Sequence, residues 1–138
     1  MTEKEYILVI GGSNADISGI PDSEFKPEDS NPGKITISAG GVGRNIAENA
    51  AKLGQNVKLL TALGNDYFGN FLREHCIEAG IDISETLISD QFPSSAYLCI
   101  MNRNRDMAGA VSDMDILNLI TPEFISRKKD TICSARHV

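Results

Sequence analysis

Asn14 and Asp16 form the first pair of side chains that could bind a small hydroxylated ligand. They follow Gly11-Gly12 at the end of an apolar run and lie two positions apart. In an extended segment, their side chains therefore point to the same side. An amide beside a carboxylate offers the donors and acceptors that suit the hydroxyls of a sugar. Asn and Asp are also common in turns, so a polar turn after a strand is the alternative interpretation.

The second stretch with chemical potential is a glycine-rich turn that leads into a helical pattern. Gly40, Gly41 and Gly43 come first, and Asn45 falls in the first helical turn. Glycine permits positive φ and lets a ligand approach the main chain closely, while a helix start presents free N–H groups. The patterns GxxxxGK[ST] and GxGxxG are both missing, which argues against a Walker A loop and a dinucleotide fingerprint. We therefore predict a ligand-binding turn followed by a buried helix.

The elements that must position these residues alternate between strands and helices. The apolar runs 6–10 and 57–63 predict parallel core strands, and helices are expected at 44–53 and 67–79. Gly54 and Gly80 are expected to end the helices, and Asn65 or Asp66 to cap the second one. The first helix is expected to bury a narrow face of mostly small residues, namely Ile46, Ala47, Ala50, Ala51 and Leu53.

A second, smaller sheet is expected outside this core. Residues 34–38 alternate apolar and polar side chains, which indicates a half-exposed strand that could form a flap over the site. Runs 95–101 and 107–111 surround a polar turn and predict a hairpin that joins it. Its methionines, with Met114, are expected to fill the flap or core, and Arg103 and Arg105 to lie in solvent.

The C-terminal stretch gives weaker signals. Asp115 is a candidate cap for residues 116–119. Thr121-Pro122 is a typical helix start, because a capping residue precedes a proline at the first helical position. Residues 130–138 are expected to lack a packed element.

Composition narrows the class of protein. The 138 residues are 41% hydrophobic, and the net charge of -6 argues against a general nucleic-acid binder. No apolar run approaches the roughly 20 residues of a membrane span, and the N-terminus lacks the features of a signal peptide. The three cysteines form no CxxC pair, so neither a metal site nor a disulfide framework is indicated. We expect one α/β domain with reduced thiols in the cytoplasm.

Several of these segments together resemble a known family. Gly40-Gly41-x-x-x-Asn45-x-Ala47, then Leu53-Gly54, then Gly64-x-Asp66-x-x-Gly69 resembles the first signature of the ribokinase-like (PfkB) carbohydrate kinases. Gly12-x-Asn14-x-Asp16 is similar to the N-terminal sugar-binding element of that family. Within the family, the segments 29–34 and 41–47 and the pair Asp113-Met114 are similar to pseudouridine kinases. The resemblance runs from about residue 6 to about residue 121.

The resemblance implies a three-layer α/β sandwich with parallel core strands and a small β-sheet lid, with lid strands near 13–20, 34–39 and 94–112. It implies that Asn14 and Asp16 bind ribose hydroxyls, and that Gly40, Gly41 and Asn45 complete the sugar pocket. Ser95 and Asp113, with Ser94, are weaker candidates for contacts to a base. Strand-end polar residues and a helix cap are the alternative interpretation of these three.

The resemblance also implies what the chain lacks. Residues 1–138 correspond to the N-terminal portion of a kinase domain, and the catalytic aspartate is expected beyond Val138, with most of the ATP and Mg²⁺ site. The implied activity is ATP-dependent phosphorylation of the 5′-hydroxyl of a ribonucleoside, with pseudouridine as the first choice. Ribose, adenosine or a fructose phosphate are alternative substrates in the same family. A non-catalytic sugar-binding or dimerising fragment is the alternative outside catalysis, and a homodimer through the lid sheet is the expected assembly.

Overall fold

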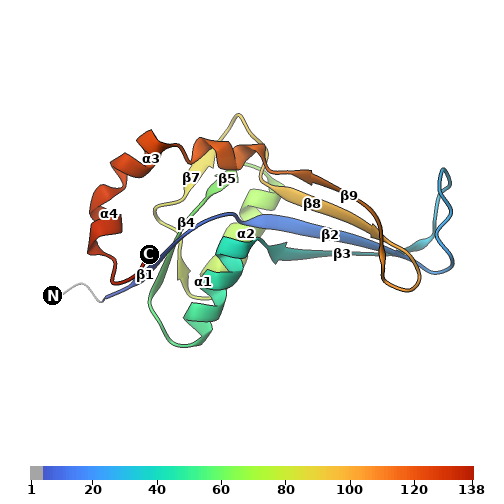
Figure 1. The fold of residues 1–138 in the computed structure, drawn as a ribbon, viewed down its shortest axis with the longest axis horizontal. Coiled ribbons are helices and arrows are strands. Elements are labelled where there is room, and N and C mark those ends of the chain that lie inside the picture. The colour runs from blue at the N-terminus through green and yellow to red at the C-terminus, as the bar shows by residue number, and fades with distance from the viewer. Residues whose placement is uncertain (1–4) are drawn as a thin grey trace.

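A computed structural model describes residues 5–138 of the chain, and its core is a short parallel sheet. Strands β1 (Ile7–Ile10), β4 (Val57–Leu60) and β6 (Ile81–Asp82) lie in the order β1-β4-β6 (Figure 1). β1 and β4 pair in parallel along their whole length, with Ile7 opposite Val57. The predicted parallel arrangement of the first two core strands is confirmed.

Helices cover both faces of this sheet. Helices α1 (Val42–Lys52) and α2 (Tyr67–Glu78) pack on one face, around a cluster of Val9, Ala47, Val57, Leu59, Cys76 and Ile81. Helices α3 (Pro122–Arg127) and α4 (Lys129–Ser134) cover the other face, where Phe124 packs with Tyr6, Leu8 and Leu60. Alternate residues of β1 thus face opposite layers, as expected for a strand buried on both sides. The result is a three-layer α/β arrangement, visible in Figure 1.

The helices begin and end where local chemistry requires. Asp66 caps α2 by accepting a hydrogen bond from the Gly69 N–H at 2.7 Å, and Thr121 caps α3 by accepting one from the Phe124 N–H. Gly54 and Gly80 follow α1 and α2 with φ of 82° and 77°, the left-handed conformation that glycine adopts most easily. These four expectations from the sequence are confirmed.

A second sheet extends away from the core. Its strands are β2 (Asn14–Pro21), β3 (Gly33–Gly40), β8 (Ala96–Met101) and β9 (Met107–Asp113), in the order β3-β2-β8-β9. β2 pairs antiparallel with β3 and parallel with β8, and β8 and β9 form the predicted hairpin. Figure 1 shows this sheet extending to one side of the core, with the loops after β2 and β8 at its far end. We call it the lid sheet.

The predicted strand 57–63 is wrong in its extent, because the structure divides it. β4 ends at Leu60, and β5 (Ala62–Gly64) pairs in parallel with β7 (Leu87–Ser89) in a separate sheet. Thr61 stands between them, fully buried, and its carbonyl accepts a hydrogen bond from the Leu87 N–H at 2.9 Å. A continuous apolar run does not reveal a change of partner, because both strands are buried.

Three further predictions are also wrong. On the face predicted to be buried, Ile46 of α1 and Leu53, its C-cap residue, are exposed at 54% and 80%, so only the alanines pack on the sheet. Asp115 does not cap the 3₁₀ helix Asp115–Leu119 (η1) but is its first residue, after Met114. Residues 130–138 do contain a packed element, because Ile132 of α4 contacts the core and His137 forms a bridge to Ile7.

Among the helices of residues 5–138, none is long and apolar enough to cross a membrane.

Candidate functional site

An open cavity of about 440 Å³ lies where β1 ends and the chain enters the lid sheet. Ligands of open α/β sheets bind beyond the carboxyl ends of the parallel strands, and this cavity has that position. The turn after β1, the start of β2, the start of α1 and the segment around η1 all contribute to its wall. The lining residues are Gly12, Asn14, Asp16, Gly41, Val42, Asn45, Met114 and Leu117.

Asn14 and Asp16 share one face of β2, as their spacing predicts. The Asn14 amide donates a hydrogen bond to Oδ1 of Asp16, and Oδ2 is the carboxylate oxygen that lies nearest to Gly40. Burial raises the pKa of Asp16 above its ordinary value, and the hydrogen bond from Asn14 offsets part of this effect. Gly40 lies opposite Asn14 in the neighbouring strand, and a Cβ on Gly40 would overlap the Asp16 carboxylate. The glycine therefore leaves the space that this carboxylate occupies.

Gly41 brings the start of α1 against the turn that follows β1. Its φ of 95° lies in the region that favours glycine, and it stands at the N-cap position without a side-chain cap. A Cβ at Gly41 would lie 2.5 Å from the Gly12 carbonyl oxygen and 2.8 Å from Oδ1 of Asn14. The Arg44 N–H donates to the same Gly12 carbonyl at 3.1 Å, which fixes the first turn of the helix beside the cavity. Asn45 reaches the cavity from this turn.

A second cavity of about 350 Å³ shares Asp16 with the first and extends along the lid sheet. Asp16 pairs with Tyr97 across β2 and β8, so both side chains lie on the same face of the sheet. Tyr97, Met101, Arg105 and Met107 surround this space. The sequence analysis missed these residues, because only the pairing of β2 with β8 places them beside Asp16.

The predicted site residues Ser95 and Asp113 line neither of these two cavities. Ser95 is fully buried, and its hydroxyl has no hydrogen-bond partner within residues 5–138. Asp113 is exposed at the end of β9, opposite Ala96. Their contact with a base stays a prediction, because neither residue lines these cavities.

Ser94 has a structural partner instead. Its N–H and hydroxyl both donate to the Asp66 carboxylate, at 2.7 and 2.8 Å, and its hydroxyl oxygen accepts from the Gly64 N–H at 2.8 Å. Burial would raise the pKa of Asp66, but the hydrogen bonds from Ser94 and Gly69 lower it overall. The segment Gly64-x-Asp66-x-x-Gly69 thus anchors the start of the lid hairpin to helix α2.

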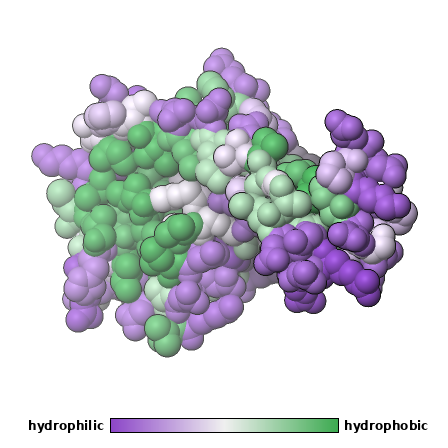
Figure 2. All heavy atoms as spheres, turned by 45° about the vertical axis from the view of Figure 1, so that its right-hand side comes forward, coloured by the Kyte–Doolittle hydropathy of each residue, from purple (hydrophilic) through white to green (hydrophobic). Residues whose placement is uncertain are grey.

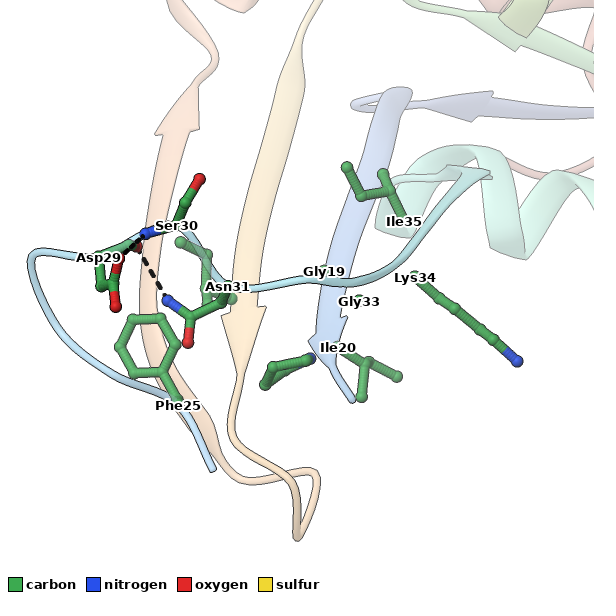
Figure 3. A pocket seen from close by; sticks show the side chains of 11 residues that line it. Gly19, Ile20, Phe25, Asp29, Ser30, Asn31, Gly33, Lys34 and Ile35 are labelled. Atoms are coloured by element: carbon green, nitrogen blue, oxygen red, sulfur yellow. Dashed lines mark hydrogen bonds between the residues drawn. The ribbon is translucent and has the colours of Figure 1, made fainter. Parts of the chain in front are cut away.

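A third cavity, of about 390 Å³, lies at the far end of the lid sheet, under the loop between β2 and β3. Figure 3 shows Phe25 and Asn31 of this loop on one side of the cavity, and Ile20 and Ile35 of the strands on the other. The Asn31 side chain bonds within the loop, to Lys26 and to the Asp29 carbonyl. None of the predicted sugar-binding residues is among those that line this cavity.

The architecture defines the class of protein. Over 96% of its length, the chain superposes with a TM-score of 0.87 on a carbohydrate kinase from Agrobacterium tumefaciens, with 30% sequence identity. That match covers 44% of the kinase. The fold is therefore the α/β ribokinase-like fold of sugar kinases, with a small β-sheet lid, as the resemblance implied.

The family follows from the sequence match. The model of the pfkB family of carbohydrate kinases matches residues 4–138, so the chain belongs to that family. A pseudouridine kinase from Escherichia coli (strain K12) is 38% identical over 136 residues, which are 99% of this chain and 44% of that protein. A guanosine-inosine kinase from Exiguobacterium acetylicum is 29% identical over 106 residues, which are 77% of this chain and 35% of that protein. The chain thus spans less than half the length of these curated relatives.

Proposed function

We propose that this chain forms the sugar-binding part of a kinase that phosphorylates the 5′-hydroxyl of a ribonucleoside, and that pseudouridine is its preferred substrate. The observation that carries the proposal is the pair of adjoining cavities with Asp16 between them. The first has the polar groups for a ribose, and the second has an aromatic and sulfur-containing wall for a base.

In the first cavity, Asp16 and Asn45 supply complementary hydrogen-bond chemistry. The Asp16 carboxylate accepts hydrogen bonds from sugar hydroxyls, and the Asn45 amide contributes a donor. Gly41 lets the sugar approach the main chain, and the Met114 and Leu117 side chains cover it. Holding the ribose in this way orients its primary hydroxyl for transfer, and positioning of this kind is a main source of rate in phosphoryl transfer.

In the second cavity, a planar base can stack on the Tyr97 ring, beside Met101 and Met107. Arg105 supplies hydrogen-bond donors for carbonyl groups at the rim. A free pentose fills the first cavity only, whereas a nucleoside fills both. This difference favours a nucleoside substrate over ribose, and the names of the two curated relatives point in the same direction.

ATP as the phosphoryl donor, the Mg²⁺ ion and the catalytic aspartate belong to the same proposal. Within the part of the chain that the structure describes, no group of three or more His, Cys, Asp or Glu residues could hold a metal ion. We therefore assign Mg²⁺ to none of these residues and derive no step through it. The residues of this chain bind and orient the acceptor, and the base that removes its proton is proposed to lie beyond Val138. A cytoplasmic location, where ATP is available, completes the proposal.

We also propose that two lids associate in a homodimer. The lid-sheet face opposite Asp16 and Tyr97 exposes a row of apolar side chains, namely Ile35 at 75%, Ile37 at 45%, Leu98 at 42%, Ile100 at 38% and Val111 at 68%. Figure 2 shows hydrophobic surface reaching from the body onto the lid, with a hydrophilic far end. Apolar patches of this kind are typical of protein–protein contacts. Because the sugar site lies on the other face, association through this one leaves it accessible.

A substrate panel tests the proposal. Isothermal titration of this chain with pseudouridine, uridine, adenosine, ribose and fructose measures binding, and phosphoryl transfer is measured on an enzyme that contains the complete family domain. We expect pseudouridine to have the highest kcat/KM. Equal or better use of another nucleoside would remove the pseudouridine assignment, and exclusive use of free sugars would remove the base subsite. Turnover of ATP by residues 1–138 alone would contradict the placement of the catalytic base.

A further inference from the structure

Arg44 is a charged side chain in an almost fully buried position. Only 4% of the residue is exposed, although it stands in the first turn of α1 beside the open cavity. Arginine is rarely buried to this extent unless it is paired. Its partner is Glu48, one helical turn later, whose Oε2 lies 2.7 Å from Nη1 of Arg44. Glu48 also pairs with Lys52 at 2.9 Å, so the ion pair continues to the surface.

The same Nη1 atom has two further acceptors, and one of them, Asn45, lines the first cavity. It donates to the Ala39 carbonyl oxygen at 3.1 Å, at the end of β3, and to Oδ1 of Asn45 at 3.2 Å. Gly40 and Gly41 lie between Ala39 and Asn45 in the chain, and Gly41 has a positive φ of 95°. Arg44 therefore connects Ala39, which precedes the glycine turn, with Asn45, which follows it.

This contact determines which end of the Asn45 amide faces a ligand. Because Oδ1 accepts from Arg44, the amino group of Asn45 is the part that can donate into the cavity. The Asp16 carboxylate lines the same cavity and can only accept when it is ionised. The site thus presents one fixed donor and one fixed acceptor. Two neighbouring hydroxyls match this pair when one accepts from Asn45 and the other donates to Asp16.

We propose that Arg44 is a positioning residue that fixes the Asn45 amide as a hydrogen-bond donor toward a sugar hydroxyl. The ligand part of this inference rests on the proposed function, whereas the fixing of Asn45 does not. Arg44→Lys retains the positive charge, but its side chain is shorter, so its Nζ cannot reach all three acceptors that Nη1 of Arg44 contacts, namely Glu48, Ala39 and Asn45. Glu48→Gln is the matched control, because it removes the ion pair and leaves the contacts of Arg44 with Ala39 and Asn45.

The first test needs no ligand. Side-chain ¹⁵N relaxation reports the order parameter of the Asn45 amide in this chain and in both variants, after thermal unfolding has shown that each variant folds. We expect an ordered Asn45 amide in the unmodified chain and in Glu48→Gln, and an order parameter below about 0.6, typical of mobile groups, in Arg44→Lys. An Asn45 amide equally ordered in all three proteins would overturn the proposal.

The second test uses pseudouridine and ribose as probes in isothermal titration. We expect Arg44→Lys to weaken binding about tenfold, equivalent to about 1.4 kcal/mol, and Glu48→Gln to change it less than about twofold. Asn45→Asp replaces the donor by a carboxylate beside Arg44 and is expected to weaken binding at least as much. Unchanged affinity in Asn45→Asp would overturn the donor assignment. If the unmodified chain binds neither probe, the proposed function fails, while the relaxation measurement still decides the role of Arg44.

Discussion

Replacing Gly41 by alanine is expected to damage the fold and the site together. Gly41 has φ of 95° and ψ of 134°, a conformation that few residues except glycine adopt, and strain of this kind costs about 1–3 kcal/mol. The added Cβ would also lie 2.5 Å from the Gly12 carbonyl oxygen and 2.7 Å from Cα of Ser13, both of which are main-chain atoms that move only with the turn. Overpacking of this kind adds about 1–3 kcal/mol, so the free energy of unfolding should fall by about 2–6 kcal/mol.

Gly54 offers a matched control for this substitution. It has a similar positive φ of 82°, but a Cβ there would meet nothing within 4 Å. Gly54→Ala should therefore cost only the conformational term of about 1–2 kcal/mol and leave ligand binding unchanged. Urea unfolding and nucleoside titration of both variants separate the two effects, because Gly41→Ala also displaces the Asn14 amide. Equal losses of stability in the two variants, with unchanged affinity in both, would refute the steric reasoning.

Three other substitutions test separate parts of the structure. Asp66→Asn should lower the free energy of unfolding by about 2–4 kcal/mol, since hydrogen bonds to a charged group contribute about 1.5–3 kcal/mol each. Because the pKa of Asp66 is lowered in the folded state, this loss of stability should be present when the pH is above 3.8, the ordinary pKa of an aspartate, and should shrink as the pH falls below it. A loss of stability that persists in acid would contradict the role given to the Asp66 carboxylate. Asp16→Asn should change the free energy of unfolding in the opposite direction. Because the pKa of Asp16 is raised in the folded state, its ionisation destabilises the fold as the pH rises. The variant should therefore be more stable than the unmodified chain at neutral pH, while it binds nucleoside less tightly. Equal urea midpoints at neutral pH would oppose that interpretation. Val111→Lys should shift the sedimentation of the protein from dimer to monomer, whereas Ser112→Lys, on the opposite face of β9, should not; identical behaviour of the two variants would argue against the proposed lid contact.

The sequence predicted well those features that depend on neighbouring residues. The Asp66 and Thr121 caps and the glycines that end α1 and α2 each act within one helical turn, and all four are found. The grouping of Asn14, Asp16, Gly41 and Asn45 around one cavity agrees with what the resemblance to the PfkB family implied for these residues.

Features that depend on distant pairing could not be predicted. The position of Tyr97 and Met101 beside Asp16 requires the register of β2 against β8, and nothing local in either strand encodes it. The break at Thr61 is hidden for a similar reason, since β4 and β5 are both buried and differ only in their partners. The exposure of Ile46 shows the opposite problem: an apolar residue at helical spacing is expected in the core, but the narrow face of α1 on the sheet is filled by alanines.

A titration of the ¹⁵N-labelled chain with pseudouridine, followed by heteronuclear NMR, tests the central claim most directly. The account predicts that the largest shifts occur at the cavity between β1 and α1, in the amides of Gly12, Asn14, Asp16, Gly41 and Asn45, with smaller shifts at Tyr97. Shifts concentrated around Phe25 and Asn31 at the far end of the lid sheet, or no shifts at saturating nucleoside, would contradict it.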